Sequence, residues 1–276
     1  MPNSNLLSLA LPSNAGDKKH VGNLKGSALS IAIAQLAEQH QGHLLLVVPD
    51  PQLALKLSAE VEQFSQRDVH LFPDWETLPY DNFSPHQDII SDRIAHLYQM
   101  PSQGDGITVI PVSTLLQRQS PRSFLLQHTL MVKSGDNYSL DALRLQLEKS
   151  GYRHVDQVFG PGEYASRGSI LDLFPMGSSD PYRIDFFDDE IDTIRTFDPE
   201  NQRSIEDSQQ IQLLPAHEFP TTKAAIEDFR TRWRSQFEAR REPESIYMQV
   251  TKGTWPAGIE YWQPLFFDHT ETLFDY

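Results

Sequence analysis

Residues 44–48 read Leu-Leu-Leu-Val-Val, and this unbroken apolar run decides the fold class. Such a run is typical of a strand that is covered on both faces, as in a parallel sheet. Asp50 and Pro51 follow it, which is the pattern of a helix cap and a proline at the first helical position. Ser27 can cap another helix, at 28–39, before the run. Helices that alternate with an apolar strand predict an α/β unit with parallel pairing.

The same alternation continues to about residue 120. We predict further strands at 69–72 and 107–112, and between them a helix within 84–97 whose apolar residues recur at helical spacing. Parallel strands of one sheet need right-handed crossovers, which these helices supply. We therefore interpret residues 21–120 as the first part of an α/β domain and residues 1–20 as a mobile or loosely docked tail.

The pattern changes after about residue 120. A short strand and a helix capped by Ser139 are followed by apolar stretches with little helix between them. The strands predicted here are 130–132, 155–159, 169–174 and 183–191. We interpret residues 121–211 as a small inserted α+β domain, mainly antiparallel. Residues 212–276 are interpreted as a return to the α/β domain, because the helical period reappears near residue 222.

The composition narrows the class of function. The 276 residues include 23 Lys and Arg against 38 Asp and Glu, which gives a net charge of −15, and there is no cysteine. Binding to DNA depends on Lys and Arg that displace counterions, so direct DNA binding is disfavoured. Disulfides and thiolate chemistry are excluded, which fits a reducing cytoplasm. No apolar run approaches the roughly 20 residues that span a bilayer, and the N-terminus lacks a signal-peptide pattern. We expect a cytoplasmic protein without membrane contact.

Residues 22–29, GNLKGSAL, stand where an α/β domain could carry a phosphate-binding loop. Such a loop needs a lysine after its last glycine and a Ser or Thr hydroxyl for Mg²⁺. Here Lys25 precedes Gly26, and Ser27 follows the glycine where the lysine would stand. Gly22, Lys25, Gly26 and Ser27 therefore form a degenerate loop. Nucleotide binding is the less favoured interpretation, and we expect no cofactor.

Residues 74–88, DWETLPYDNFSPHQD, are rich in acids and aromatic rings. An acid–base site needs carboxylates whose surroundings push their pKa values apart, and nothing in this stretch indicates burial. We interpret it as a proline-pinned loop whose Trp75, Tyr80 and Phe83 pack on the core. The ten histidines show no His-x-x-x-His pair, and no Gly-x-Ser-x-Gly motif occurs. The sequence therefore favours a chain that is not an enzyme.

Residues 182–190, YRIDFFDDE, carry the most informative pattern. Alternate residues of a strand share a face, so Ile184 and Phe186 would make a core face. The opposite face would hold Arg183, Asp185 and Phe187. An exposed phenylalanine beside arginine is typical of a protein-binding hot spot. Phe187 could equally be covered by the preceding hairpin or by the loop that follows, and the sequence leaves both possibilities open.

Arg167 would join this face if the preceding strand pairs in a simple register. Leu171 and Leu173 would then share the face, which would not be cleanly polar. A β-bulge would remove the conflict, but the sequence does not reveal one.

Five stretches carry a family likeness, and they occur in the same order along nearly the whole chain: 74–86, 151–158, 172–177, 186–192 and 258–262. They resemble the N-terminal region of the bacterial transcription-repair coupling factors, the Mfd family. More distantly, they resemble the damage-recognition helicase UvrB. The resemblance implies a degenerate helicase-like parallel-sheet domain with an inserted small α+β domain.

The resemblance also implies a task. In that family this UvrB-like module recruits the repair protein UvrA to RNA polymerase stalled at a lesion, in nucleotide excision repair. The positions that match its UvrA-binding surface are Arg167, Arg183 and Phe187, and Asp185 matches a UvrB acid. The family implies that RNA polymerase and DNA are engaged through other domains. Its motor, which uses ATP and Mg²⁺, would lie outside these residues in a longer protein.

Two departures from UvrB accompany the likeness. The phosphate-loop lysine is missing, and the segment between Trp75 and Ile90 is too short for the UvrB hairpin that inserts into DNA. Both favour a non-catalytic docking module over the alternative, a UvrB-like nucleotide- or DNA-binding helicase fragment.

Overall fold

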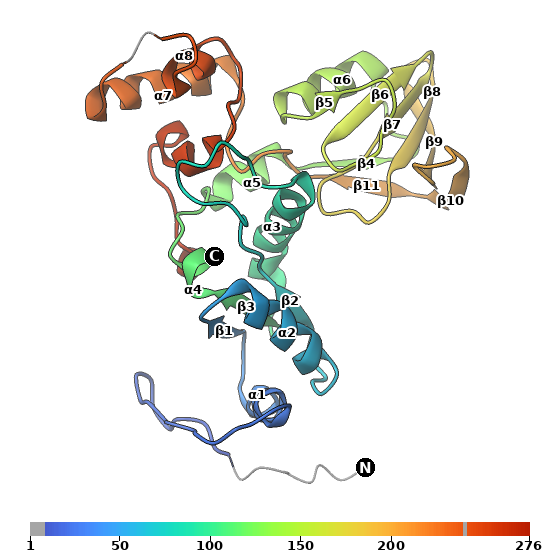
Figure 1. Ribbon diagram of the computed structural model, residues 1–276. Helices are drawn as coiled ribbons and strands as arrows, with labels where there is room; N and C mark the ends of the chain where they lie inside the picture. The colour runs from blue at the N-terminus through green and yellow to red at the C-terminus, as the bar shows by residue number, and fades with distance from the viewer. Residues whose placement is uncertain (1–8, 240–241) are drawn as a thin grey trace. The chain divides into compact units, whose positions relative to one another are not determined.

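The computed structural model describes residues 9–239 and 242–276, which form a mixed α/β protein with parallel and antiparallel sheets (Figure 1). The chain divides into two compact units. The first contains the chain up to Asp74 together with Gln99–Gln117, and the second contains Trp75–Tyr98 and Arg118–Tyr276. The expected tail at 1–20 falls partly on residues 1–8, which lie outside the described part of the chain. The domain limits at 120 and 211 and the likeness to a helicase stay predictions.

The first unit is built on a three-stranded parallel sheet in the order β1–β3–β2. Its strands are β1 (Leu44–Val48), β2 (Val69–Leu71) and β3 (Ile107–Pro111). The helices α1 (Ala28–Gln39) and α2 (Pro51–Glu62) share one apolar cluster with these strands. The predicted parallel pairing is therefore confirmed. The short helices η1 (Met100–Ser102) and α4 (Val112–Leu115) flank β3.

Local sequence explains where these elements begin. The Asp50 side chain accepts a hydrogen bond from the Leu53 amide at 2.8 Å, and Pro51 opens α2 as predicted. Ser27 precedes α1 but makes no side-chain cap. The expectation that residues 44–48 are covered on both faces is wrong for β1. It is an edge strand of its sheet, and Val47 is 43% exposed.

The second unit contains a large aromatic core built from residues 219–267. Phe229 and Trp233 of α7 pack there against Phe266, which lies in the 3₁₀ helix η2. Thr222 caps α7 through a hydrogen bond from the Ala225 amide. The helical elements are α3 (Gln87–Gln99), α5 (Arg122–His128), α6 (Leu140–Lys149), α7 (Lys223–Gln236), α8 (Ile246–Thr251), η2 (Ile259–Phe266) and η3 (Leu273–Asp275).

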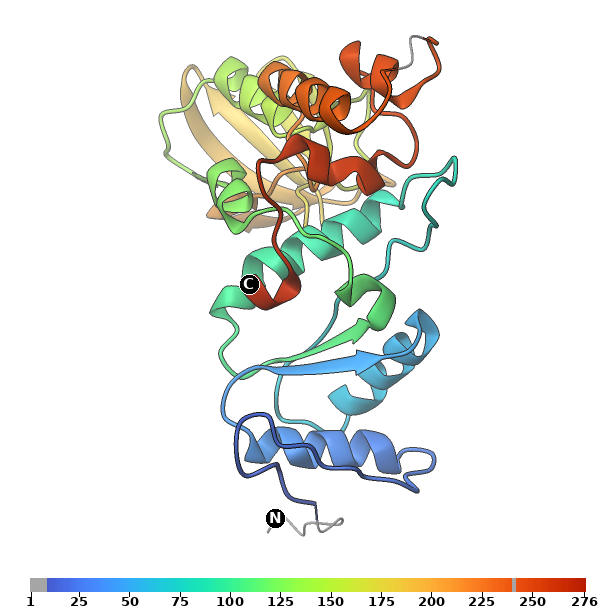
Figure 2. The same cartoon turned by 90° about the vertical axis from the view of Figure 1, so that its left-hand side faces the viewer.

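The second unit contains a six-stranded sheet, which is mainly antiparallel as predicted (Figures 1 and 2). Its strand order is β10–β9–β8–β7–β6–β5, and only the β5–β6 pair is parallel. The strands are β5 (Arg153–His154), β6 (Glu163–Arg167), β7 (Ile170–Leu173), β8 (Tyr182–Phe187), β9 (Glu190–Phe197) and β10 (Ser204–Ser208). A separate pair joins β4 (Leu130–Lys133) to β11 (Gln210–Leu213).

Two strand predictions are wrong. Residues 155–159 form a loop after the short strand β5, because Val158 turns inward to a small core while Phe159 stays exposed. The single strand expected at 183–191 is two strands, β8 and β9, joined by a tight turn at Asp188 and Asp189. Asp188 adopts a left-handed backbone (φ 51°), which aspartate tolerates better than most residues.

Candidate protein-docking site

The two faces of β8 differ as the alternation predicted. Ile184 and Phe186 are buried, whereas the Phe187 side chain is 72% exposed. The sequence left open whether Phe187 is covered, and the structure shows that it is exposed. A register shift between Asp185 and Phe186 places the extra residue in β9, so the alternation along β8 continues to its end.

The turn of the β8–β9 hairpin carries Phe187 at its base. Phe187 pairs with Glu190, and only Asp188 and Asp189 stand between them. All four residues are exposed. The ring is therefore presented at the end of a hairpin, beside three carboxylates.

Arg183 lies on the same face of β8 as Phe187, four residues before it and beyond Asp185. Its guanidinium donates to both carboxylate oxygens of Asp172, at 2.7 and 2.8 Å, and to the Gln202 carbonyl at 3.2 Å. It also lies 4.9 Å from the centre of the Phe197 ring. The hydrogen bonds to Asp172 raise the pKa of Arg183, and only 18% of its side chain is exposed. Arg183 therefore stabilises the sheet through these contacts and offers little free charge to a partner.

Asp185 is half-buried and has two partners on β9. Its carboxylate accepts a hydrogen bond from the Thr193 hydroxyl at 3.0 Å and forms an ion pair with Arg195. Arg195 is directly opposite Arg183 in the register. Sequence reasoning missed Arg195, because one long strand at 183–191 left no partner strand to carry it. It missed Asp172 for a similar reason, although a lone acid within an apolar strand was a usable signal.

Arg167 reaches this face through the turn between β6 and β7. Gly168, in a left-handed conformation (φ 61°), and Ser169 form that turn, so Arg167 pairs with Ile170 and Ile170 pairs with Asp185. Residues directly opposite one another share a face, which places Arg167 on the same face as Asp185, with Ile170 of β7 between them. Arg167 is exposed and donates to the Asp156 carbonyl at 3.0 Å.

The expectation that Leu171 and Leu173 share this face is corrected by the same register. Both leucines are fully buried on the opposite side of the sheet. Because the turn between β6 and β7 has two residues, odd-numbered residues of β6 lie on the same face as even-numbered residues of β7. No bulge is therefore needed between these strands. The structure therefore places these charged residues on the face of the sheet to which the exposed Phe187 also belongs. We call this surface the docking face and define it as Arg167, Asp185, Phe187 and Arg195, together with the less exposed Arg183 on the same face.

The loop before α3 differs from its prediction. Trp75 is buried as expected, and its ring makes an edge contact with Tyr261 at 5.0 Å between centres. Tyr80 and Phe83 do not pack on the core: they are 90% and 70% exposed. Tyr80 lies in a turn at residues 78–81 and has a positive φ of 74° there.

The degenerate phosphate loop lies on the surface before α1. Gly22, Lys25, Gly26 and Ser27 are exposed, and the Lys25 carbonyl accepts a hydrogen bond from the Ala28 amide at 3.2 Å. The absence of nucleotide binding stays a prediction. Among residues 9–239 and 242–276, no group of three or more His, Asp or Glu side chains is arranged to hold a metal ion. In the same residues, no helix combines the length and apolarity that a membrane span requires.

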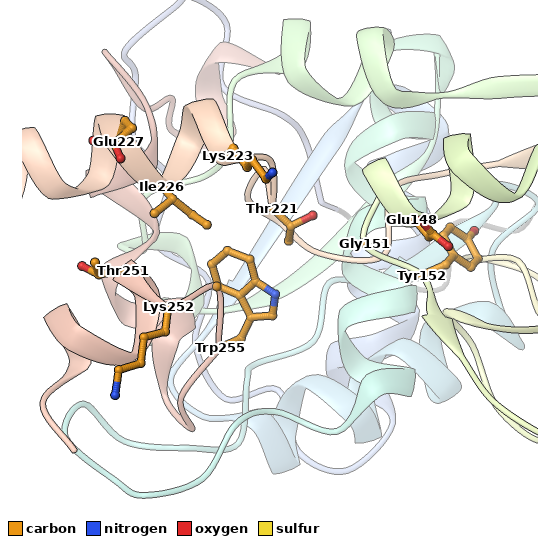
Figure 3. A pocket seen from close by; sticks show the side chains of 11 residues that line it. Glu148, Gly151, Tyr152, Thr221, Lys223, Ile226, Glu227, Thr251, Lys252 and Trp255 are labelled. Atoms are coloured by element: carbon orange, nitrogen blue, oxygen red, sulfur yellow. The ribbon is translucent and has the colours of Figure 1, made fainter. Parts of the chain in front are cut away.

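A cavity of about 570 Å³ opens between the ends of α6, α7 and α8 (Figure 3). Trp255 and Ile226 form an apolar wall, and Lys223 and Glu148 bring opposite charges to the rim. Glu148 already accepts a hydrogen bond from the Tyr164 hydroxyl at 2.9 Å. The mixed lining selects no single class of ligand.

Comparisons with known proteins agree with the resemblance. A family model described as the UvrB interaction domain matches residues 130–219, which include the whole docking face. The transcription-repair-coupling factor of Escherichia coli (strain K12) is 57% identical over 96% of this chain and 23% of its own length. That of Haemophilus influenzae is 52% identical over the same shares, and that of Rickettsia prowazekii is 28% identical over 84% of this chain and 21% of its own.

The chain spans about a quarter of the length of these relatives. Its similarity nevertheless runs along almost every residue, and the family match falls on the sheet that carries the exposed ring. The chain therefore carries a UvrB interaction domain at residues 130–219 and is recognised, by similarity over 96% of its length, as the counterpart of one part of the transcription-repair-coupling factors.

Proposed function

We propose that this chain is a non-catalytic protein-docking module that recruits UvrA to RNA polymerase stalled at a DNA lesion, in transcription-coupled nucleotide excision repair. Its similarity to transcription-repair-coupling factors and its UvrB interaction domain support the process. The docking face, which lies within that domain, supports the partner. RNA polymerase and DNA would be engaged by other parts of a longer polypeptide, and the module would act in the cytoplasm.

The observation that carries the proposal is the exposure of Phe187. A phenylalanine ring in water forgoes roughly 1.5–3 kcal/mol of burial free energy. This ring sits on a hairpin whose neighbouring strands are paired, so little ordering is required when a partner covers it. Arg167 and the Asp185–Arg195 pair lie on the same face of the sheet and supply polar groups that can form a rim.

The residues of the docking face would contribute in different ways. Phe187 and Arg167 are exposed, so a partner can contact them directly. Arg183 is a positioning residue, because its guanidinium is engaged by the nearly buried Asp172. Removing Arg183 would leave that carboxylate unpaired and lower stability as well as binding. Phe187 and Arg167 are therefore the cleaner tests.

The test is a calorimetric titration of purified UvrA with the chain and its variants. Phe187→Ala should weaken binding by about 1–4 kcal/mol and Arg167→Ala by about 1 kcal/mol or more, as at other hot spots. Phe274→Ala is the matched control, because Phe274 is 75% exposed and lies in η3, outside the docking face. Equal affinity of the parent chain and both docking-face variants would remove this surface from the proposal.

The non-catalytic part of the proposal rests on the degenerate loop. Lys25 precedes Gly26 there, so a triphosphate would lack the lysine that normally reaches its terminal phosphates. Calorimetry with ATP and Mg²⁺ should show no heat of binding. Saturable binding at micromolar concentration would contradict this and favour the helicase-like alternative.

A further inference from the structure

A second surface of the protein exposes apolar side chains without any role in the docking face. We call residues 76–84 the tyrosine loop. It leads toward α3, and Leu78, Tyr80 and Phe83 within it are all largely exposed. Three such residues within six positions of the chain are unusual, because exposed apolar residues are common singly, whereas several together mark an interaction site.

Both ends of the tyrosine loop are fixed to the second unit. Before it, the indole nitrogen of the buried Trp75 donates to Glu218 at 3.4 Å. At its far end, the Ser84 hydroxyl donates to Glu260 at 3.0 Å and accepts a hydrogen bond from the Gly258 amide at 3.1 Å. The loop therefore presents its side chains from an anchored backbone.

Tyr80 occupies a backbone conformation that suits glycine. Residues 78–81 form a turn, closed by the Asp81 amide on the Leu78 carbonyl at 3.0 Å, and the Asp81 carboxylate accepts from the Leu78 amide at 2.9 Å. Pro79 stands at the second position and Tyr80, with φ 74°, at the third. A turn of this type requires a positive φ at its third position, where glycine or asparagine is normal. A tyrosine there is strained.

Among the described residues, packing of the Tyr80 ring does little to offset that strain. The Tyr80 side chain is 90% exposed, so it gains almost no packing. Glycine in its place would complete the same turn without strain. Strained residues persist where they serve a site, and a ring held outward at a cost to folding is suited to burial by a partner.

Charge indicates the kind of partner. Glu76 and Asp81 lie in the loop, Asp88 and Asp92 follow in α3, and the chain as a whole has a net charge of −15. Surfaces that stack nucleic-acid bases on aromatic rings are basic, because they also track the phosphates. This surface has the opposite sign. It fits a protein that offers apolar pockets flanked by Lys and Arg.

We propose that the tyrosine loop is a second contact for UvrA, the partner inferred above, so this inference rests on the proposed function. The chemistry of the two surfaces is alike: each holds an exposed ring at a tight turn with a left-handed residue other than glycine, among carboxylates. One partner whose surface is apolar and basic can satisfy both. Two contacts on one module raise the overall affinity above that of either contact alone.

The experiment compares purified UvrA binding by the parent chain, Tyr80→Gly, Tyr80→Asn and Phe83→Ser. Glycine and asparagine keep the turn and delete the ring, so the melting temperature should stay equal or rise. Each variant should weaken UvrA binding about tenfold. Leu126→Ser is the matched control, since Leu126 is also exposed in the second unit but lies on the regular helix α5, and its affinity should equal that of the parent.

The outcomes separate the two proposals. If the parent chain does not bind UvrA, the proposed function fails and this inference fails with it. If Phe187→Ala weakens binding while the loop variants bind like the parent, the docking face stands and the inference is overturned. A lower melting temperature for Tyr80→Gly would show that the ring stabilises the chain itself, and would also overturn it. So would binding of single-stranded DNA that is lost in the Tyr80 variants.

Discussion

Arg93 of α3 and Glu218 form an ion pair that is almost completely removed from water. Their side chains are 0% and 1% exposed, and the Arg93 Nε lies 2.5 Å from a Glu218 oxygen. The Trp75 indole donates to the same oxygen, and the Arg93 guanidinium lies 4.8 Å from the centre of that ring. Such a pair adds little net stability compared with apolar residues, but either partner is costly to bury alone.

Glu218→Gln should therefore lower the free energy of unfolding by about 3–5 kcal/mol, because the buried Arg93 charge would lose the carboxylate of Glu218. Urea unfolding followed by circular dichroism measures the change. The double variant Arg93→Met, Glu218→Leu should recover much of the loss. A single variant as stable as the parent would show that other contacts of Arg93, such as its hydrogen bond to Gln119, compensate for the lost carboxylate.

Glu260, at the start of η2, gives the chain a dependence on pH. Burial raises the pKa of Glu260 to about 7, against hydrogen bonds that lower it, including one from Ser84, and the nearby Glu218 charge adds to the rise. Between the ordinary value of 4.5 and about 7, folded Glu260 keeps a proton that the unfolded chain has lost. The unfolding free energy should thus decrease as the pH rises through this window, by at most on the order of 3 kcal/mol.

Glu260→Gln removes that ionisation. We expect the variant to be more stable than the parent at pH 8 and similar to it below pH 4.5. Denaturant titrations at several pH values test this, and Glu244→Gln, an exposed acid in the same unit, serves as the control. A parent chain whose stability is unchanged between pH 5 and 8 relative to the Glu260→Gln variant would contradict the expectation.

At the scale of elements, the turn between β6 and β7 sets where Arg167 stands. Gly168 has φ 61°, and a Cβ added there would meet no atom within 4 Å. Gly168→Ala should consequently lose about 1 kcal/mol of unfolding free energy from backbone strain alone. Gly160→Ala is the control, because its surroundings are equally open and its φ is not in the positive range. Urea midpoints for both variants measure the difference, and equal midpoints would show that the turn relaxes.

Regular elements with strong periodicity were predictable from the sequence. The bounds of α1 and β1 match their predictions, and so does the cap of α2, because apolar spacing and capping residues act locally. Register was not predictable. The pairing of Arg167 with Ile170 depends on turn length, and one residue more would move the arginine to the other face.

The docking face was predictable only in part, because it depends on strand register as well as on alternation within one strand. Alternation along β8 identified Phe187 as a residue of the outer face, but its exposure depends on which loops cover that face. The partner of Arg183 is Asp172 on β7, and that contact exists only once two strands are aligned. Tyr80 illustrates the converse case. An aromatic side chain suggests burial, whereas its left-handed backbone turns it outward.

At the scale of the whole molecule, the net charge of −15 opposes compaction. Raising the salt concentration from about 10 to about 200 mM shortens the screening length from ~30 Å to below ~10 Å. The melting temperature should rise by about a few degrees in consequence, in sodium chloride and in potassium chloride alike. Differential scanning calorimetry measures it. A melting temperature that falls with salt would indicate that attractive ion pairs, such as Arg195–Asp185, outweigh the repulsion.

The separation of Arg93 and Glu218 along the chain has a consequence for synthesis. The two residues are 125 positions apart, and the arginine leaves the ribosome first. During translation the Arg93 guanidinium therefore cannot pair with Glu218 until nearly all of residues 130–219 have been synthesised. A nascent chain halted before residue 218 could still form α3 contacts such as the hydrogen bond from the Gly177 amide to Ser91, but Arg93 would lack the carboxylate that neutralises it in the folded protein.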